Sequence, residues 1–235
     1  MPTANVVSKQ EWIEARKALL DQEKEFQRQR DAIAANLREL PCVEVDEDYV
    51  FDGPDGEVRL CELFEGHSQL IVQHFMFQAD WTEGCPNCSF WADGWDPMVV
   101  HLNHRDVSMA AVSIAPIDKL GAYSERMNWT FRWVSSANND FNRDFNVTTT
   151  PEELEQGKTY YNYRQTRPYG LESPGMSVFY RNEDGAIFHT YSTYARGLDR
   201  LNAAYHLLDM VPKGRDEGDL PHPMAWVRRH DSYED

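Results

Sequence analysis

A short apolar run at residues 69–77, QLIVQHFMF, most constrains how this chain can fold. β-Branched and aromatic residues in so short a run are typical of a buried strand. Further strands are predicted at 106–113 and 130–135, with helix-forming stretches at 85–102 and 116–128 between them. This alternation of strand and helix indicates a largely parallel sheet covered by helices.

The C-terminal half adds a different kind of element. Residues 176–182 and 186–194 read as two strands around an Asp184-Gly185 turn, which is a hairpin signal. A last amphipathic helix is predicted over 197–211. The polar, turn-rich residues 137–173 are expected to form an insertion on the surface, without being a separate domain. The predicted fold is therefore α/β, with a central mixed sheet flanked by helices.

A long, highly charged helix is predicted over residues 8–38, where Ser8 and Glu11 form a capping box and Pro41 follows the end. Its apolar residues recur at helical spacings: Trp12, Ala15, Leu19, Phe26, Ile33 and Leu37. So thin a stripe packs either on the body of the protein or on a partner chain. We expect self-association, a homo-oligomer formed through this helix.

Three parts of the chain follow from these patterns. Residues 1–41 form an N-terminal helical extension, residues 42–212 the main domain, and residues 213–235 a charged C-terminal tail. The 235 residues suffice for one sizeable domain with extensions, and hydrophobic residues at 41% supply a core.

The formal net charge of −16 argues against nucleic acids and anionic membranes as partners. No apolar stretch approaches the roughly 18 residues of a membrane span. The N-terminal residues lack the basic start and apolar segment of a secretory signal, so a cytoplasmic location is expected. Thiols are usually kept reduced there, so the four cysteines are not expected to form a structural disulfide framework.

Two of those cysteines stand as Cys85-Pro86-Asn87-Cys88, between the first predicted strand and a predicted helix. At the start of a helix they would lie one turn apart, close enough to form a disulfide. The free N–H groups and the helix dipole would favour the thiolate of Cys85, which attacks, while Cys88 resolves the mixed disulfide. Pro86 suits the first helical turn because it lacks an N–H.

A metal site is the alternative interpretation of the same cysteines. His101 and His104 complete a C-x2-C-x12-H-x2-H pattern that nearly matches a zinc finger. A finger needs a hairpin that carries the cysteines, whereas a buried-strand pattern precedes them here. A third possibility is that the cysteine pair is neither redox-active nor metal-binding. For His74, two interpretations stay open: it tunes the pKa of a thiol, or it is a core histidine whose ring nitrogens are hydrogen-bonded within the protein.

Four stretches resemble a bacterial domain-of-unknown-function family of the thioredoxin-like superfamily, whose members are labelled predicted dithiol-disulfide oxidoreductases. They are FMFQADWTEGCPNCSFWADG, VSMAAVSIAPIDKLGAY, WTFRWVSSANNDFNRDF and SVFYRNEDGAIFHTYSTYARGLDRLNAAYHLLD. The resemblance runs from about residue 6 to about residue 230. It implies a thioredoxin-like sheet in which Cys85 is the attacking and Cys88 the resolving cysteine. It also implies that Pro174 is the cis-proline that shapes the substrate groove.

A peroxiredoxin-like reading competes with this one. Peroxiredoxins carry Pro-x3-Thr/Ser-x2-Cys before a helix, and Thr82 stands at the threonine position relative to Cys85. The proline position holds Gln78, which departs from that pattern. Arg126 or Arg132 would supply the cation that such sites place beside the cysteine.

The sequence thus predicts a thiol-disulfide oxidoreductase whose site comprises Cys85, Cys88, Pro174 and Thr82, with a protein or small-molecule disulfide, or a peroxide, as substrate. It predicts no cofactor and no metal. The alternatives are a peroxiredoxin-like thiol peroxidase and a non-catalytic thioredoxin-like binding module.

Overall fold

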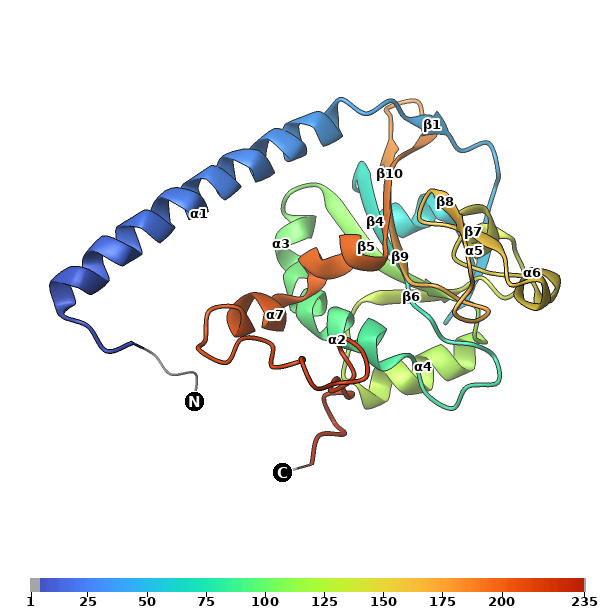
Figure 1. Ribbon diagram of the computed structural model, residues 1–235. Coiled ribbons are helices and arrows are strands. Elements are labelled where there is room, and N and C mark those ends of the chain that lie inside the picture. The colour runs from blue at the N-terminus through green and yellow to red at the C-terminus, as the bar shows by residue number, and fades with distance from the viewer. Residues whose placement is uncertain (1–4, 235) are drawn as a thin grey trace.

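A single mixed sheet of eight strands organises residues 5–234, which the computed structural model describes (Figure 1). The strands are β1 (Val43–Glu44), β2 (Val50–Gly53), β3 (Gly56–Arg59), β4 (Gln69–His74), β5 (Val107–Ser113), β6 (Arg132–Ser135), β9 (Gly175–Arg181) and β10 (Ile187–Tyr194). Their order across the sheet is β1-β10-β9-β4-β5-β6-β2-β3. The strand that precedes the cysteine pair, β4, therefore lies inside the sheet.

Within the described residues, parallel pairing joins only β4 to β5 and β5 to β6. The hairpin of β9 and β10 pairs antiparallel with β4, and β2 and β3 form an antiparallel hairpin against β6. The expectation of a largely parallel sheet was therefore wrong, because the four strands of the two hairpins outnumber the three parallel strands. The predicted mixed sheet is confirmed, and the order β10-β9-β4-β5 with these directions is that of a thioredoxin-like fold.

One face of the sheet carries α2 (Pro86–Trp95) and α4 (Ile117–Arg126). These helices connect β4 to β5 and β5 to β6, and both connections step in the same direction across the sheet. Right-handed crossovers that step the same way place their helices on the same face. Aromatic residues fill the space between, including Phe75, Tyr123 and Trp133.

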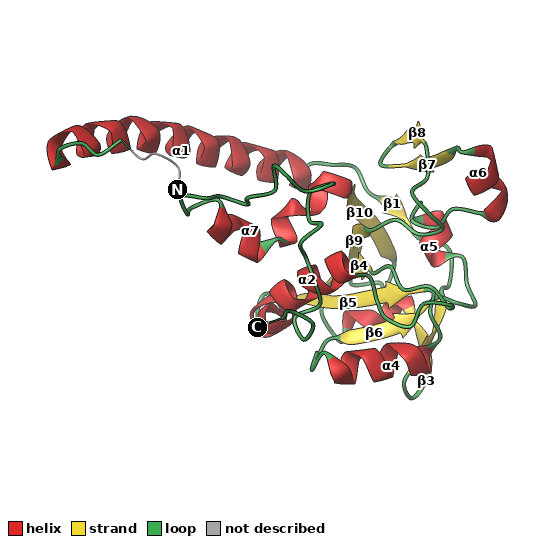
Figure 2. Ribbon diagram, turned by 60° about the horizontal axis from the view of Figure 1, so that its bottom comes forward, coloured by secondary structure: helices red, strands yellow, loops and turns green. Residues whose placement is uncertain are grey.

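The opposite face is covered by the 3-10 helix η1 (Leu60–Phe64) and by α5 (Phe141–Asp144). Phe141 is fully buried there, although it belongs to the polar stretch 137–173. That stretch therefore supplies core residues as well as surface. Its remaining elements, α6 (Pro151–Gln156), β7 (Thr159–Tyr161) and β8 (Arg164–Thr166), lie to one side of the main sheet (Figure 2).

Two predicted helices are interrupted. The stretch 85–102 divides into α2, a 3-10 turn η2 (Asp96–Met98) and α3 (Val99–Asn103), since Pro97 has no N–H to continue the helical hydrogen bonds. The stretch 197–211 divides into the 3-10 helix η3 (Ala195–Leu201) and α7 (Ala203–Leu208). Their boundary is Asn202, whose side chain receives a hydrogen bond from the buried Trp91 indole.

The predicted N-terminal helix is confirmed as α1 (Lys9–Arg38), with Ser8 and Glu11 as a reciprocal capping box. None of its residues is buried. Figures 1 and 2 show it as a straight rod projecting from the domain, on the side away from β7 and β8. Among the described residues, 5–234, no helix is long and apolar enough to cross a membrane.

Candidate active site

The two cysteines of the Cys-Pro-Asn-Cys sequence open α2 from a loop that follows β4. Cys85 is the N-cap of the helix, and Pro86 occupies its first turn. Both thiols are free, and Cys85 is 7% exposed while Cys88 is fully buried. The predicted order of strand, loop, cysteine pair and helix is therefore present.

Met76 holds both cysteines through its backbone. Its carbonyl oxygen accepts a hydrogen bond from the Cys85 N–H at 3.0 Å, and its own N–H donates to the Cys88 sulfur at 3.5 Å. The preceding Gly84 lies where a side chain would not fit: a Cβ there would lie 2.7 Å from the Phe75 ring and 2.8 Å from the Tyr123 ring. Gly84 thus allows the loop to press Cys85 against the core.

The C-terminal tail reaches back to this loop through Arg229. The guanidinium donates to the Gly84 carbonyl oxygen at 2.7 Å and to the Tyr123 hydroxyl at 3.0 Å, and it pairs with Glu83 at 3.0 Å. The same Tyr123 hydroxyl lies 2.9 Å from the Ser89 hydroxyl, on the first turn of α2. A positive charge is thereby fixed beside Cys85.

These surroundings separate the two thiol pKa values. The neighbouring Cys88 thiol lowers the pKa of Cys85 most, and burial opposes it. The N–H groups at the start of α2 and the charge of Arg229 lower the Cys85 pKa further. Burial raises the pKa of Cys88 well above its ordinary value, and the adjacent Cys85 adds to that shift. Cys85 is therefore the thiol that ionises more readily, and Cys88 the one that keeps its proton.

A buried carboxyl group lies beside the pair. Glu172 is 6% exposed, and its Oε2 atom has no hydrogen-bond partner among residues 5–234. Burial raises the pKa of Glu172 to about 8, the charge of Cys85 adds to the shift, and the N–H of Phe77 opposes it. The charge of Glu172 in turn raises the pKa of Cys88. The three ionisable groups form one electrostatic unit.

The position of Glu172 follows from backbone pairing. Ser173 donates to the Val147 carbonyl oxygen at 2.8 Å, and Thr149 donates to that of Leu171 at 2.8 Å. The segment before β9 is thus tied to the stretch after α5. Glu172 was not among the predicted site residues, since a glutamate in a turn-rich stretch carries no signal of burial.

A surface pocket of about 330 Å³ gives access to Cys85. Cys85, Trp81, Thr82, Pro86 and Arg229 are among the residues that line it. Thr82 is exposed and makes no hydrogen bond to Cys85 within residues 5–234. The predicted site residue Thr82 therefore lines the same pocket as Cys85 without a hydrogen bond to the thiol.

Pro174 directly precedes β9, whose first residue, Gly175, pairs with His74 at the end of β4. Its carbonyl oxygen accepts a hydrogen bond from the Tyr161 hydroxyl at 2.7 Å. Every peptide bond in the described part of the chain is trans, so the expected cis bond at Pro174 was wrong. The Tyr161 hydrogen bond and the pairing of Ser173 with Val147 tie this segment to the preceding stretch of the chain. A role of Pro174 in the site stays a prediction.

The histidines considered at the sequence level are not brought to the cysteines. His101 lies on α3, exposed, and His104 follows its end. Across residues 5–234, no three His, Cys, Asp or Glu side chains are placed to hold a metal ion. His74 is a core residue: its ring nitrogens bond Asn142 at 3.0 Å and Ser177 at 2.8 Å.

The cation beside Cys85 is also not the one expected. Arg126 pairs with Glu83 and Asp231, and Arg132 with Glu65, so neither contacts the thiol. Arg229 occupies that place, from a tail that the sequence patterns describe only as charged. The apolar residues 224–227 are the sequence signal that could have indicated the position of Arg229. Val227 is buried and anchors the tail two residues before Arg229.

Similar folds occur among solved structures. Peroxidoxin BcpB from Mycobacterium tuberculosis is 14% identical, with a TM-score of 0.46, and the match covers 70% of this chain and 94% of that one. A peroxiredoxin Q from Xanthomonas campestris is 12% identical, with a TM-score of 0.44, covering 66% and 88%. A putative thiol:disulfide interchange protein DsbE from Chlorobium tepidum is 12% identical, with a TM-score of 0.41, covering 69% and 93%.

No curated protein matches the sequence. A family model does, over residues 1–233, and its description is "Bacterial protein of unknown function (DUF899)". This confirms the resemblance to a bacterial family of unknown function, and the topology confirms its thioredoxin-like fold. The chain belongs to the DUF899 family.

Proposed function

We propose that the protein is a thiol-disulfide oxidoreductase in which Cys85 attacks and Cys88 resolves. One observation carries the proposal: two free thiols lie together at the N-terminus of α2, with their pKa values displaced in opposite directions. A low-pKa thiol at a pocket and a protonated thiol behind it are what disulfide exchange requires.

In the first step, the Cys85 thiolate attacks one sulfur of a substrate disulfide. A Cys85–substrate disulfide forms, the substrate S–S bond breaks, and the released sulfur leaves as a thiolate that takes a proton from water. In the second step, the Cys88 sulfur, after losing its proton, attacks the Cys85 sulfur. The second substrate thiolate leaves, and the protein holds a Cys85–Cys88 disulfide. The substrate gains two electrons, and an external dithiol returns the protein to its reduced form.

Glu172 is the proposed acceptor of the Cys88 proton. While Cys85 is a thiolate, its charge helps to keep Glu172 protonated. Formation of the mixed disulfide removes that charge, so the pKa of Glu172 falls and Glu172 releases its proton to water. The carboxylate that results can then take the proton of Cys88. The unpartnered Oε2 atom leaves the carboxylate free to receive the proton.

Pro174 and the pocket residues are proposed to receive the substrate. Glu172, in the segment before β9, interacts electrostatically with both cysteines, and Trp81 and Arg229 line the pocket at Cys85. Arg229 also suits a second candidate function, a thiol peroxidase. There the Cys85 thiolate would attack a peroxide oxygen, the O–O bond would break, and the second oxygen would leave as an alcohol or water after taking a proton from water. Cys88 would then displace water from the Cys85 sulfenic acid to give the same disulfide.

The test measures reduction of the insulin disulfides with dithiothreitol as the electron donor. Cys85→Ser is expected to abolish turnover, while Cys88→Ser is expected to accumulate a mixed disulfide with oxidised glutathione, seen in the intact mass. Cys42→Ser, at an exposed cysteine, is the matched control and should turn over like the unaltered protein.

Replacing insulin by hydrogen peroxide separates the two candidate functions. If the protein reduces hydrogen peroxide faster than it reduces the insulin disulfides, the thiol peroxidase function is favoured. Turnover that survives Cys85→Ser would overturn both, and inactivity towards both oxidants would favour a non-catalytic binding module.

A further inference from the structure

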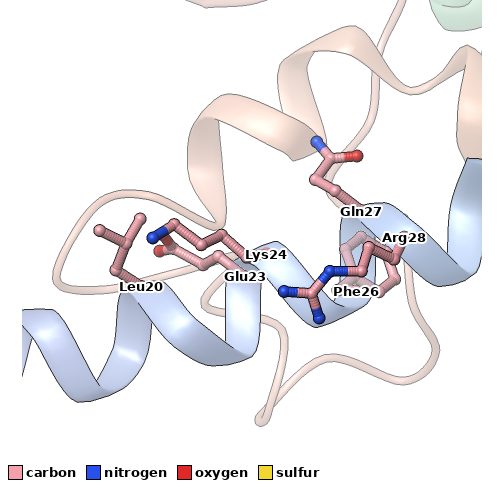
Figure 3. A pocket seen from close by; sticks show the side chains of 6 residues that line it. All are labelled: Leu20, Glu23, Lys24, Phe26, Gln27 and Arg28. Atoms are coloured by element: carbon pink, nitrogen blue, oxygen red, sulfur yellow. The ribbon is translucent and has the colours of Figure 1, made fainter.

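The surface of α1 carries large apolar side chains that nothing in the described chain covers. Trp12, Leu19, Phe26 and Ile33 are each at least 50% exposed, and no residue of the helix is buried. The hollow in Figure 3, about 660 Å³ in volume, is lined by six residues that all belong to α1. Phe26 borders this hollow and is 60% exposed.

The spacing of these four residues is seven in every case. A strict seven-residue apolar repeat lets two α-helices keep the same seam in contact by winding around each other. Thirty residues give a helix of about 45 Å, long enough for four such layers. The alternate seam positions hold Ala15, Gln22 and Gln29, and amide pairs of this kind fix the register of two helices at some cost in stability.

The charges beside the seam indicate which chain covers it. α1 has seven Lys and Arg residues and six Asp and Glu residues, although the whole chain has a net charge of −16. Two copies of α1 can therefore meet without the repulsion that acidic surfaces impose. In a parallel pair, the residue directly preceding each of the four apolar seam residues in the sequence faces a residue of the other helix whose number is higher by five. This sets Glu11 against the partner's Arg16, and Glu25 against the partner's Arg30.

We propose that two copies of this chain associate through α1, as a parallel, in-register coiled coil with Trp12, Leu19, Phe26 and Ile33 in its seam. An antiparallel pair would set these residues against the partner's small and amide side chains. In the parallel pair, each of the four seam residues faces the same residue of the other helix. The two-fold axis also makes each ion pair occur twice. The proposal does not depend on the redox chemistry of the cysteines.

The first experiment measures the mass of the full-length protein in solution by light scattering. A mass of twice 27.3 kDa is expected for the unaltered chain. Phe26→Glu and Leu19→Glu should each give the single-chain mass, since both put a charge into the seam. Lys17→Glu, on the opposite face of α1, is the control and should remain a dimer. A single-chain mass for the unaltered protein overturns the proposal, as does a dimer that survives both seam variants.

The second experiment tests the parallel register. Glu25→Arg alone and Arg30→Glu alone should each weaken the dimer, and the double variant should restore it. Residues 25 and 30 are five apart, so they do not face each other on one helix, and restoration requires pairing between chains. A double variant as weak as the single ones would overturn the parallel arrangement. Circular dichroism of each variant shows that the helix content is kept.

Discussion

The Arg229 side chain donates a hydrogen bond of 2.7 Å to the carbonyl oxygen of Gly84, the residue before Cys85. Two segments more than a hundred residues apart are joined there, and the same guanidinium lowers the pKa of Cys85. The tail after α7 thus does two things at once: it closes the loop around α2 and it supplies the cation of the site.

Arg229→Gln is expected to raise the pKa of Cys85, because it removes a positive charge that favours the thiolate. The rate of alkylation by iodoacetamide as a function of pH measures that pKa. At neutral pH the variant should react more slowly than the unaltered protein. Arg228→Gln is the control, since Arg228 is exposed and its guanidinium donates to the carbonyl oxygens of Ala225 and Val227 in the tail. An alkylation profile unchanged by Arg229→Gln would contradict the electrostatic role.

Gly84→Ala should destabilise the protein by about 1–3 kcal/mol, as overpacking in a filled core does. Its Cβ would press on the Phe75 and Tyr123 rings and displace the loop that carries Cys85. Chemical unfolding measures the free energy, and alkylation of Cys85 reports the displaced loop. Gly121→Ala is the matched control, because a Cβ at that position of α4 meets nothing and alanine favours a helix. Equal stabilities of the two variants would refute the close-packing argument.

Glu172→Gln should change how stability depends on pH. In the folded protein the pKa of Glu172 is about 8, above its ordinary value of 4.5, so the unfolded chain releases this proton first. The stabilisation is complete below pH 4.5 and is lost as pH rises towards 8, with a slope of up to about 1.4 kcal/mol per unit. Free energies of unfolding at pH 5 and 8 under reducing conditions should show a smaller loss in the variant. The same decline in both proteins would argue against a buried, protonated carboxyl.

His74 gives the opposite dependence. Burial lowers the pKa of His74 to about 4, so the folded protein holds it neutral. Its contribution is complete above pH 6.5 and is lost as pH falls towards 4. His74→Gln should flatten the acid side of the stability profile, although the lost packing lowers stability throughout. His104→Gln, at an exposed position, should leave the profile as it is. If His74→Gln kept the full acid dependence, protonation of His74 would not be its cause.

The sequence patterns predicted the fold best where local chemistry and tertiary structure agree. The capping box of Ser8, the Asp-Gly turn and the apolar run before Cys85 all correspond to elements found in the structure. They failed where a distant contact decides the outcome. The hairpin of β2 and β3 joins the sheet through a single bridge from Asp52 to Ser135, which no local pattern encodes.

The same distinction applies to the site. Cys85 and Cys88 are recognisable because their chemistry depends on three-residue spacing at a helix start. Glu172 and Arg229 are not, because each reaches the cysteines through the packing of a segment with no regular structure. The bond before Pro174 was expected to be cis from a resemblance alone, and it is trans in the structure.

The placement of β4 in the interior of the sheet has a consequence for the thermal unfolding of the protein. Its backbone amides are bonded to β5 on one side and β9 on the other, so they should be among the slowest to exchange with deuterium. The loop that carries the thiols leaves directly from this strand. Loss of activity on heating should therefore coincide with collapse of the whole domain and should not precede it.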